Sequence, residues 1–134
     1  MLVTVRPFRS DEGRAFFDIH TRAIRGLAAQ HYSPEVIAAW AAPVSDQGLQ
    51  GFLKNPDGEV RLIAEVDGAP VGLGVTVISN SELRACYVVP EAARQGVGSA
   101  IVYEIAAEHD QRLRASWTSR QSSFGSRVRY GRRA

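Results

Sequence analysis

The chain has 134 residues, of which 45% are hydrophobic and 22% charged, so we expect one small globular domain rather than a disordered chain. Its single cysteine, Cys86, excludes an internal disulfide, and no run of 18 or more apolar residues predicts a membrane span. Because the N-terminus alternates like a strand and does not have the pattern of a signal peptide, we expect a cytoplasmic protein.

Charge is divided unevenly along the chain. Residues 1–111 contain 14 acidic and nine basic side chains, whereas residues 112–134 contain seven arginines and no acid. The formal net charge of +2 therefore combines an acidic body with a basic C-terminal segment. Arginine-rich segments can bind nucleic acid, but the aromatic residues interleaved here are too few to favour that interpretation.

The N-terminal half predicts a strand followed by three helices. Residues 2–6 alternate between apolar and polar types, and apolar residues recur with helical spacing over residues 16–27. Ser33 followed by Pro34 is typical of the start of a second helix. Ser45 begins a third and shorter helix in the same way.

Three further strands are predicted in the second half of the chain. An Asp-Gly pair joins residues 60–66 to residues 70–78, and this pair is typical of a two-residue hairpin turn. Gly72 and Gly74 inside the second of these strands indicate a bulge or a close backbone approach. The last predicted strand covers residues 83–89.

The most informative pattern lies at the end of that last strand. The chain passes from an apolar strand through a proline and a glycine-containing turn into a helix that we expect over residues 98–110. Gly96 and Gly98 let the backbone come close to a ligand, and the first N–H groups of a helix have no partner within it. Together with the positive end of the helix dipole, those N–H groups favour a phosphate or pyrophosphate, and Arg94 adds a mobile positive charge.

Two other phosphate-binding patterns fit this turn less well. A Walker loop requires a lysine in the turn, and the only lysine of the chain is Lys54. A dinucleotide fingerprint requires a third glycine, but Ile101 stands at that position, and the turn follows several elements rather than the first strand. A dinucleotide-binding protein stays an alternative hypothesis.

A Tyr-Val-x-Pro strand end followed by a basic/Gln-x-x-Gly-x-Gly turn resembles the GNAT (Gcn5-related) N-acetyltransferases, in particular a bacterial branch. The resemblance implies an α/β fold, the GNAT-like acyl-CoA N-acyltransferase fold, in which a mixed sheet has helices on both faces. It implies that the turn grips the pyrophosphate of acetyl-coenzyme A (acetyl-CoA) and that the strand pairs with the pantetheine arm. The cofactor-binding residues carried over by position are Tyr87, Val88, Val89, Arg94, Gln95, Gly96, Val97, Gly98 and Ser99. Ala93 departs from the pattern, since the family usually has Gln or Arg there.

The C-terminal part departs further from the family. We expect residues 113–119 to form the fifth strand and the start of the next helix, so that residues 1–119 make up the GNAT domain. We expect residues 120–134 to be an atypical arginine-rich tail that does not form the usual closing strands of the family. Two explanations stay open. The gene has a frameshift or premature stop, which we favour, or the tail is remodelled to pair with another chain, as in a homodimer.

The family resemblance implies acetyl transfer to a primary amine of a small molecule or a peptide, without a metal ion. We predict Glu82 as the base that deprotonates the amine, with Glu65 as an alternative. The backbone N–H of Val88 or Val89 is the expected donor to the thioester oxygen. Tyr130 is a candidate for the acid that protonates the leaving thiolate.

Four other residues carry expectations about the site or the core. His31 and Tyr32 lie between the first two helices, a segment that lines the acceptor site in the family, so we predict that they contact the substrate. We expect Trp40 in the core, and His109 near a helix end, where the helix dipole accounts for it.

A second hypothesis for the whole chain is a catalytically impaired CoA-binding or interaction module derived from a GNAT domain.

Overall fold

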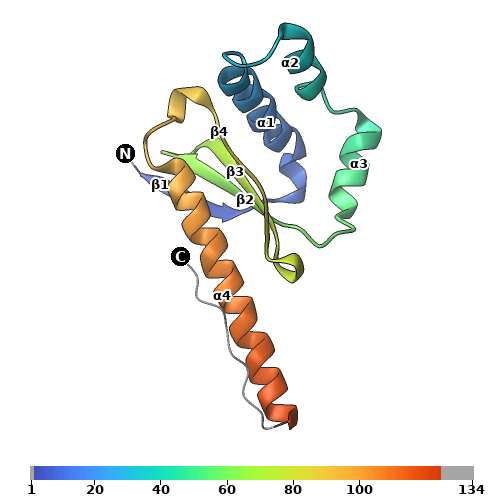
Figure 1. The fold of residues 1–134 in the computed structure, drawn as a ribbon, viewed down its shortest axis with the longest axis vertical. Coiled ribbons are helices and arrows are strands. Elements are labelled where there is room, and N and C mark those ends of the chain that lie inside the picture. Colours follow the sequence, from blue (N-terminus) through green and yellow to red (C-terminus); the bar gives the residue numbers. More distant parts are fainter. Residues whose placement is uncertain (1, 125–134) are drawn as a thin grey trace.

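The computed structural model describes residues 2–124, and the side chains of these residues except 27–28 and 115–124. The helices and strands in chain order are β1 (Val3–Pro7), α1 (Gly13–Ala28), α2 (Pro34–Trp40), α3 (Asp46–Lys54), β2 (Val60–Val66), β3 (Ala69–Val77), β4 (Glu82–Val88) and α4 (Val97–Phe124) (Figure 1). No helix within this range is both long and apolar enough to cross a bilayer.

The four strands form one sheet in the order β1-β2-β3-β4, and every neighbouring pair is antiparallel. Asp67 and Gly68, at φ values of 51° and 88°, form the predicted tight turn between β2 and β3. The predicted α/β class is confirmed. The described strands include no parallel pair, however, so they do not form the mixed sheet that we expected.

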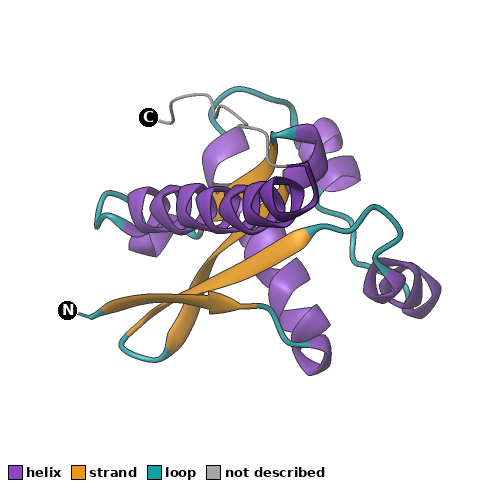
Figure 2. Cartoon of the chain, turned by 90° about the horizontal axis from the view of Figure 1, so that it is seen from below, coloured by secondary structure: helices purple, strands orange, loops and turns teal. Residues whose placement is uncertain are grey.

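Helices cover both faces of the sheet (Figure 2). α1 packs on β3 and β4 from one side, and α4 crosses the other side. Ile19 and Ala23 of α1, Ile63 and Leu73 of the sheet, and Ile101 of α4 are each at most 1% exposed. The helical spacing of apolar residues predicted for the first helix thus corresponds to its buried face.

The caps predicted for the two short helices are present. The hydroxyl of Ser33 accepts a hydrogen bond from the N–H of Val36 at 3.3 Å, and the hydroxyl of Ser45 accepts one from the N–H of Gly48 at 3.0 Å. Each cap satisfies one of the N–H groups that a helix start leaves without a partner. The serines therefore set where α2 and α3 begin.

β3 lies close to α4 at its two glycines. A Cβ atom on Gly74 would collide with the side chain of Ile101, and one on Gly72 would come within 3.1 Å of both Ile101 and Val97. Without these side chains the helix can lie directly on the strand. The predicted close backbone approach is confirmed, and the register shift of β3 comes after it, at Val75.

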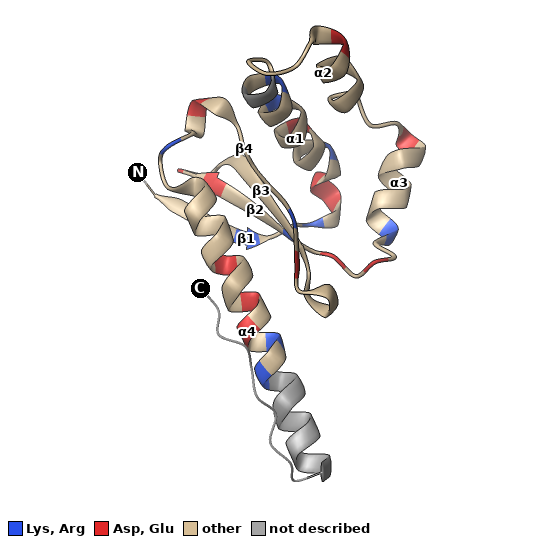
Figure 3. Cartoon of the chain, viewed as in Figure 1, with Lys and Arg blue, Asp and Glu red and all other residues tan. Residues whose placement is uncertain are grey.

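α4 continues as a helix to Phe124, so the fifth strand that we expected over residues 113–119 is wrong. No glycine or proline follows Gly98 within the helix, and arginine, alanine and glutamine favour helix. Two i,i+4 ion pairs join successive turns: Arg112 with Glu108 at 3.2 Å, and Arg114 with Asp110 at 2.9 Å. The described charges of the helix change from acidic to basic along its length (Figure 3).

His109 consequently lies inside α4 rather than near a helix end, which corrects our expectation about it. Its Nε2 is 2.7 Å from the hydroxyl of Thr76, and that hydroxyl donates to the carbonyl of Glu82 at 2.6 Å. Thr76 is completely buried, so its hydroxyl needs both partners. A hydrogen bond, not a helix dipole, therefore accounts for His109, and it ties α4 to β3 and β4.

Candidate functional site

The turn between β4 and α4 has the backbone conformation of the predicted anion site. After β4 the chain makes a short 3-10 helix at Pro90–Ala92 and then turns into α4 (Figure 1). Arg94 and Gly96 have φ values of 64° and 83°, in the left-handed region that glycine adopts at least cost. The carbonyl of Gly96 accepts the first helical hydrogen bond, from the N–H of Ala100 at 3.0 Å.

The first amides of α4 are available to an anion. The N–H groups of Val97, Gly98 and Ser99 precede the first helical hydrogen bond and have no partner in the part of the chain that the structure describes. The Val97 side chain is buried and anchors the turn, whereas Arg94, Gln95 and Ser99 are exposed. Free amides at the positive end of a helix dipole fit a phosphate or diphosphate.

α1 holds the turn from the other side. Arg22 of α1 forms an ion pair with Glu91, and α1 lies so close to the turn at Gly26 that a Cβ atom there would collide with Pro90. Because these contacts hold Pro90 and Glu91 of the 3-10 helix against α1, the turn is supported by α1 as well as by the core under Val97. Such support keeps the three amides in a fixed arrangement.

Among the described residues, β4 has a free edge beside this turn. Its other edge pairs with β3, where Val88 lies opposite Gly72 and the N–H of Val89 donates to the carbonyl of Val71 at 2.9 Å. In an antiparallel ladder, successive residues alternate between bonding to the partner strand and pointing away from it. The N–H and carbonyl of Val88 therefore point to the free edge. Of the two donors predicted for a developing oxyanion, Val88 is available and Val89 is not.

Tyr87 does not share the surface of the turn. Its side chain lies on the α1 side of the sheet, where its ring centroid is 4.9 Å from that of His20 and the two planes meet at 88°. Burial lowers the pKa of His20. Tyr87 thus lies on the strand predicted to line the pantetheine, but its ring belongs to the α1 face. Sequence analysis did not select His20, although its spacing of four from the buried Phe16 places it on the inner side of α1.

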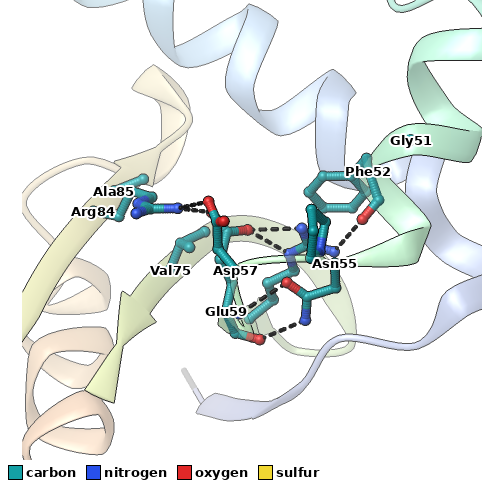
Figure 4. Close-up of a pocket in the computed structure, with 10 residues that line it drawn as sticks. Gly51, Phe52, Asn55, Asp57, Glu59, Val75, Arg84 and Ala85 are labelled. Atoms are coloured by element: carbon teal, nitrogen blue, oxygen red, sulfur yellow. Dashed lines mark hydrogen bonds and ion pairs between the residues drawn. The ribbon is translucent and has the colours of Figure 1, made fainter. Parts of the chain in front are cut away.

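Glu82, the predicted base, lies at the opposite end of β4 from the turn. Arg84 forms an ion pair with it at 3.1 Å. Arg84 also contacts Asp57 at 3.0 Å and Glu59 at 2.8 Å (Figure 4). The hydrogen bond from Arg84 lowers the pKa of Glu82. Its carboxylate is held in this ion cluster at the end of β4 away from the turn, so the structure does not favour Glu82 as the base.

The cavity beside this ion network is small, and the charged residues that line it form ion pairs with one another. It has a volume of about 270 Å³ and is lined by Phe52, Val75 and Arg84 among others (Figure 4). Arg61 lies over the ring of Phe52, 3.5 Å from the ring centroid, and pairs with Glu59 at 2.7 Å. These contacts join α3 to the sheet, so the cluster serves the packing of the domain.

Glu65, the alternative base, is also held in an ion pair. It pairs with Arg6 of β1 at 2.9 Å, and Arg6 binds both carboxylate oxygens of Glu12, at 2.7 and 2.9 Å. β1 and β4 are the opposite edges of the sheet. The two predicted bases therefore lie in separate ion clusters, and the structure does not bring either one to the turn.

His31 and Tyr32 are exposed between α1 and α2. A groove of about 420 Å³ there is lined by Arg25, Ala29, Tyr32, Pro34, Ile37 and Ala38. Tyr32 packs edge-on against Trp40 with ring centroids 4.7 Å apart, and Trp40 is 49% exposed, so our expectation that it is a core residue is wrong. The structure does not bring His31 and Tyr32 to the β4–α4 turn, and their contact with substrate stays a prediction.

Tyr130, the candidate acid, lies outside the described residues. Within the described residues, no three His, Cys, Asp or Glu side chains are grouped as they would be to hold a metal ion. Burial raises the pKa of Cys86, so its thiol stays protonated, as expected of a small buried side chain.

Comparison with known proteins identifies the family of the chain. The family model described as "Acetyltransferase (GNAT) domain" matches residues 28–130. A curated relative from Escherichia coli (strain K12), "Uncharacterized N-acetyltransferase YafP", is 29% identical over 121 residues, which cover 88% of this chain and 75% of the relative.

Solved structures show the same fold. The PaiA N-acetyltransferase from Thermoplasma acidophilum, solved in complex with coenzyme A, aligns with a TM-score of 0.71 and 21% identity, over 84% of this chain and 74% of the other. A GCN5-related N-acetyltransferase from Rhodopseudomonas palustris aligns with a TM-score of 0.67 and 24% identity, over 84% and 70% of the two chains. Because the family model covers most of the sequence, the chain belongs to the GNAT acetyltransferase family.

Proposed function

We propose that this acetyltransferase transfers the acetyl group of acetyl-CoA to a primary amine. The observation that carries the proposal is the set of three free amides, Val97, Gly98 and Ser99, at the start of α4 beside the free edge of β4. Family membership and the coenzyme A bound to the Thermoplasma relative support acetyl-CoA as the donor.

Each part of the site has a task in this reaction. The three amides and Arg94 hold the pyrophosphate, whose negative charge they complement. The outward N–H and carbonyl of Val88 pair with the pantetheine arm, and the N–H then stabilises the negative charge that develops on the thioester oxygen. The amine nitrogen bonds to the carbonyl carbon, the carbon–sulfur bond breaks, and coenzyme A leaves as the thiol.

A second candidate function is CoA binding without efficient transfer. It is favoured by the engagement of both predicted bases, Glu82 with Arg84 and Glu65 with Arg6. In this case the amides would still hold the pyrophosphate, and only the deprotonation of the amine would be impaired.

A thiol-release assay tests the proposal. Acetyl-CoA is mixed with the protein and with a polyamine, a peptide with a free N-terminus, a peptide containing lysine, or an aminoglycoside, and binding of acetyl-CoA is measured by calorimetry in parallel. Turnover with any of these amines supports the proposed function. Binding without turnover supports the second candidate, and the absence of binding overturns both.

A further inference from the structure

His20 occupies a position that neither the fold nor the anion-binding turn explains. It lies on the inner side of α1, the helix that packs on β3 and β4. Its ring is half-buried and meets Tyr87 edge-on at 4.9 Å, yet neither ring nitrogen has a hydrogen-bond partner in the described part of the chain. A half-buried imidazole with free nitrogens is able to exchange a proton with a ligand.

The position of Tyr87 connects this imidazole to the proposed reaction centre. Tyr87 precedes Val88, whose N–H points to the free edge of β4 and would bind the thioester oxygen. A carbonyl that accepts a hydrogen bond from a strand edge lies near the plane of the sheet, so a nucleophile approaches it from one face. On the α4 face, the start of α4 lies close to β4, because a Cβ atom at Gly98 would be 3.8 Å from the Val88 side chain. His20 stands on the opposite, α1 face, beside Tyr87.

We propose that His20 is the proton acceptor for the amine, which approaches the thioester from the α1 face. This inference rests on the proposed function. One proton moves from the ammonium group of the acceptor to a ring nitrogen of His20, and the neutral amine bonds to the acetyl carbon. The carbon–sulfur bond breaks, the thiolate takes a second proton from the former amine, and His20 releases its own proton to solvent.

The surroundings of His20 keep its ring neutral. Burial lowers the pKa of His20, so the imidazole is ready to accept a proton at neutral pH. From β4 it faces the phenol of Tyr87, and β3 contributes no charged residue. On α1, Asp18 pairs with Arg22, Arg14 pairs with Asp46 of α3, and Arg22 pairs with Glu91 of the 3-10 helix. Arg25, the remaining charged residue of α1, is exposed and lines the groove between α1 and α2. Glu35 of α2 is exposed.

The kinetic test compares the wild-type protein with His20→Gln, using acetyl-CoA and the amine that is turned over fastest in the thiol-release assay. We expect kcat/KM to fall about 100-fold, a typical loss for a general base, with unchanged affinity for acetyl-CoA. The wild-type rate falls as the pH drops through the lowered pKa of His20, and His20→Gln lacks this fall. His109→Gln removes an imidazole away from the turn and keeps the pH profile.

A second measurement needs no acceptor. In proton NMR spectra, we expect the carbon-bound ring protons of His20 to shift when acetyl-CoA saturates the protein, while those of His109 stay in place. If acetyl-CoA binds and the His20 signals do not move, or if His20→Gln keeps the wild-type pH profile, the inference is overturned and the proposed function stands. If acetyl-CoA does not bind, the proposed function itself fails.

Discussion

Gly98 is the residue at which ligand binding can be separated from folding. A Cβ atom at this position would be 3.8 Å from the Val88 side chain, an ordinary contact, so a larger residue extends into the space in front of the free amides rather than into the core. We expect Gly98→Val to abolish acetyl-CoA binding in calorimetry and to leave a cooperative thermal unfolding transition.

The matched control is Gly51→Ala, on an exposed face of α3 where an added Cβ atom meets nothing within 4 Å. This variant should bind acetyl-CoA as the wild type does. Undiminished binding by Gly98→Val would show that the amides of α4 are not the pyrophosphate site.

Glu12 gives the domain a pH-dependent contribution to stability. The two hydrogen bonds from Arg6 lower the pKa of Glu12 in the folded state, so folding is favoured while the carboxylate is ionised. This stabilisation is present above the pKa of the carboxyl group in the unfolded chain, and it is lost as the pH falls through the lowered folded value.

We expect Glu12→Gln to lower the free energy of unfolding by about 2 kcal/mol at neutral pH and to flatten its dependence on pH in the acid range. Urea unfolding at a series of pH values measures both effects. Asp11→Asn is the control, because the Asp11 side chain is 85% exposed. Equal pH dependence in wild type and Glu12→Gln would contradict the assigned role of the Arg6 pair.

Among the elements, the contact of β3 with α4 is the most sensitive to added volume. A methyl group at Gly74 would have to displace Ile101, which is completely buried. We expect Gly74→Ala to destabilise the domain by about 1–3 kcal/mol, the usual cost of overpacking a core. Gly51→Ala should instead stabilise it by about 0.5–1 kcal/mol, because alanine favours helix. Chemical denaturation of the two variants should therefore give shifts of opposite sign, and shifts of equal sign would contradict the close approach.

The turns and helix starts that depend on residues close together in the sequence could be predicted from it. The Asp-Gly turn, the serine caps of α2 and α3, and the turn at Gly96 each depend on residues a few positions apart. The extent of α4 was missed because the family resemblance required a strand at residues 113–119, where the local composition favours helix.

The parts of the site that sequence analysis missed depend on residues far apart in the chain. The pairing of Arg84 with Asp57 and Glu59 joins segments that are far apart in the sequence, and it places Arg84, the partner of Glu82, inside an ion cluster. The contact of His20 with Tyr87 likewise exists only after α1 has packed on β4. The helical periodicity of the sequence predicts that His20 lies on the inner face of α1, but it does not predict the contact with Tyr87.

For the molecule as a whole, the proposed reaction depends on three elements that meet at one edge of the sheet. α4 supplies the amides, β4 supplies the outward N–H of Val88, and α1 supplies His20 and supports the turn through Arg22 and Glu91. The ion clusters of Arg6 and Arg84 lie elsewhere and hold the domain together. The binding edge of the sheet is therefore distinct from the parts of the sheet that provide stability.

The most direct measurement of this account is a backbone amide correlation spectrum of the wild-type protein during titration with acetyl-CoA, repeated with NAD. We predict that the amide signals of Val88, Val97, Gly98 and Ser99 shift to saturation with acetyl-CoA and stay in place with NAD. Saturable shifts confined to other elements, or the same shifts with NAD, would contradict the claim that the start of α4 binds the pyrophosphate of acetyl-CoA.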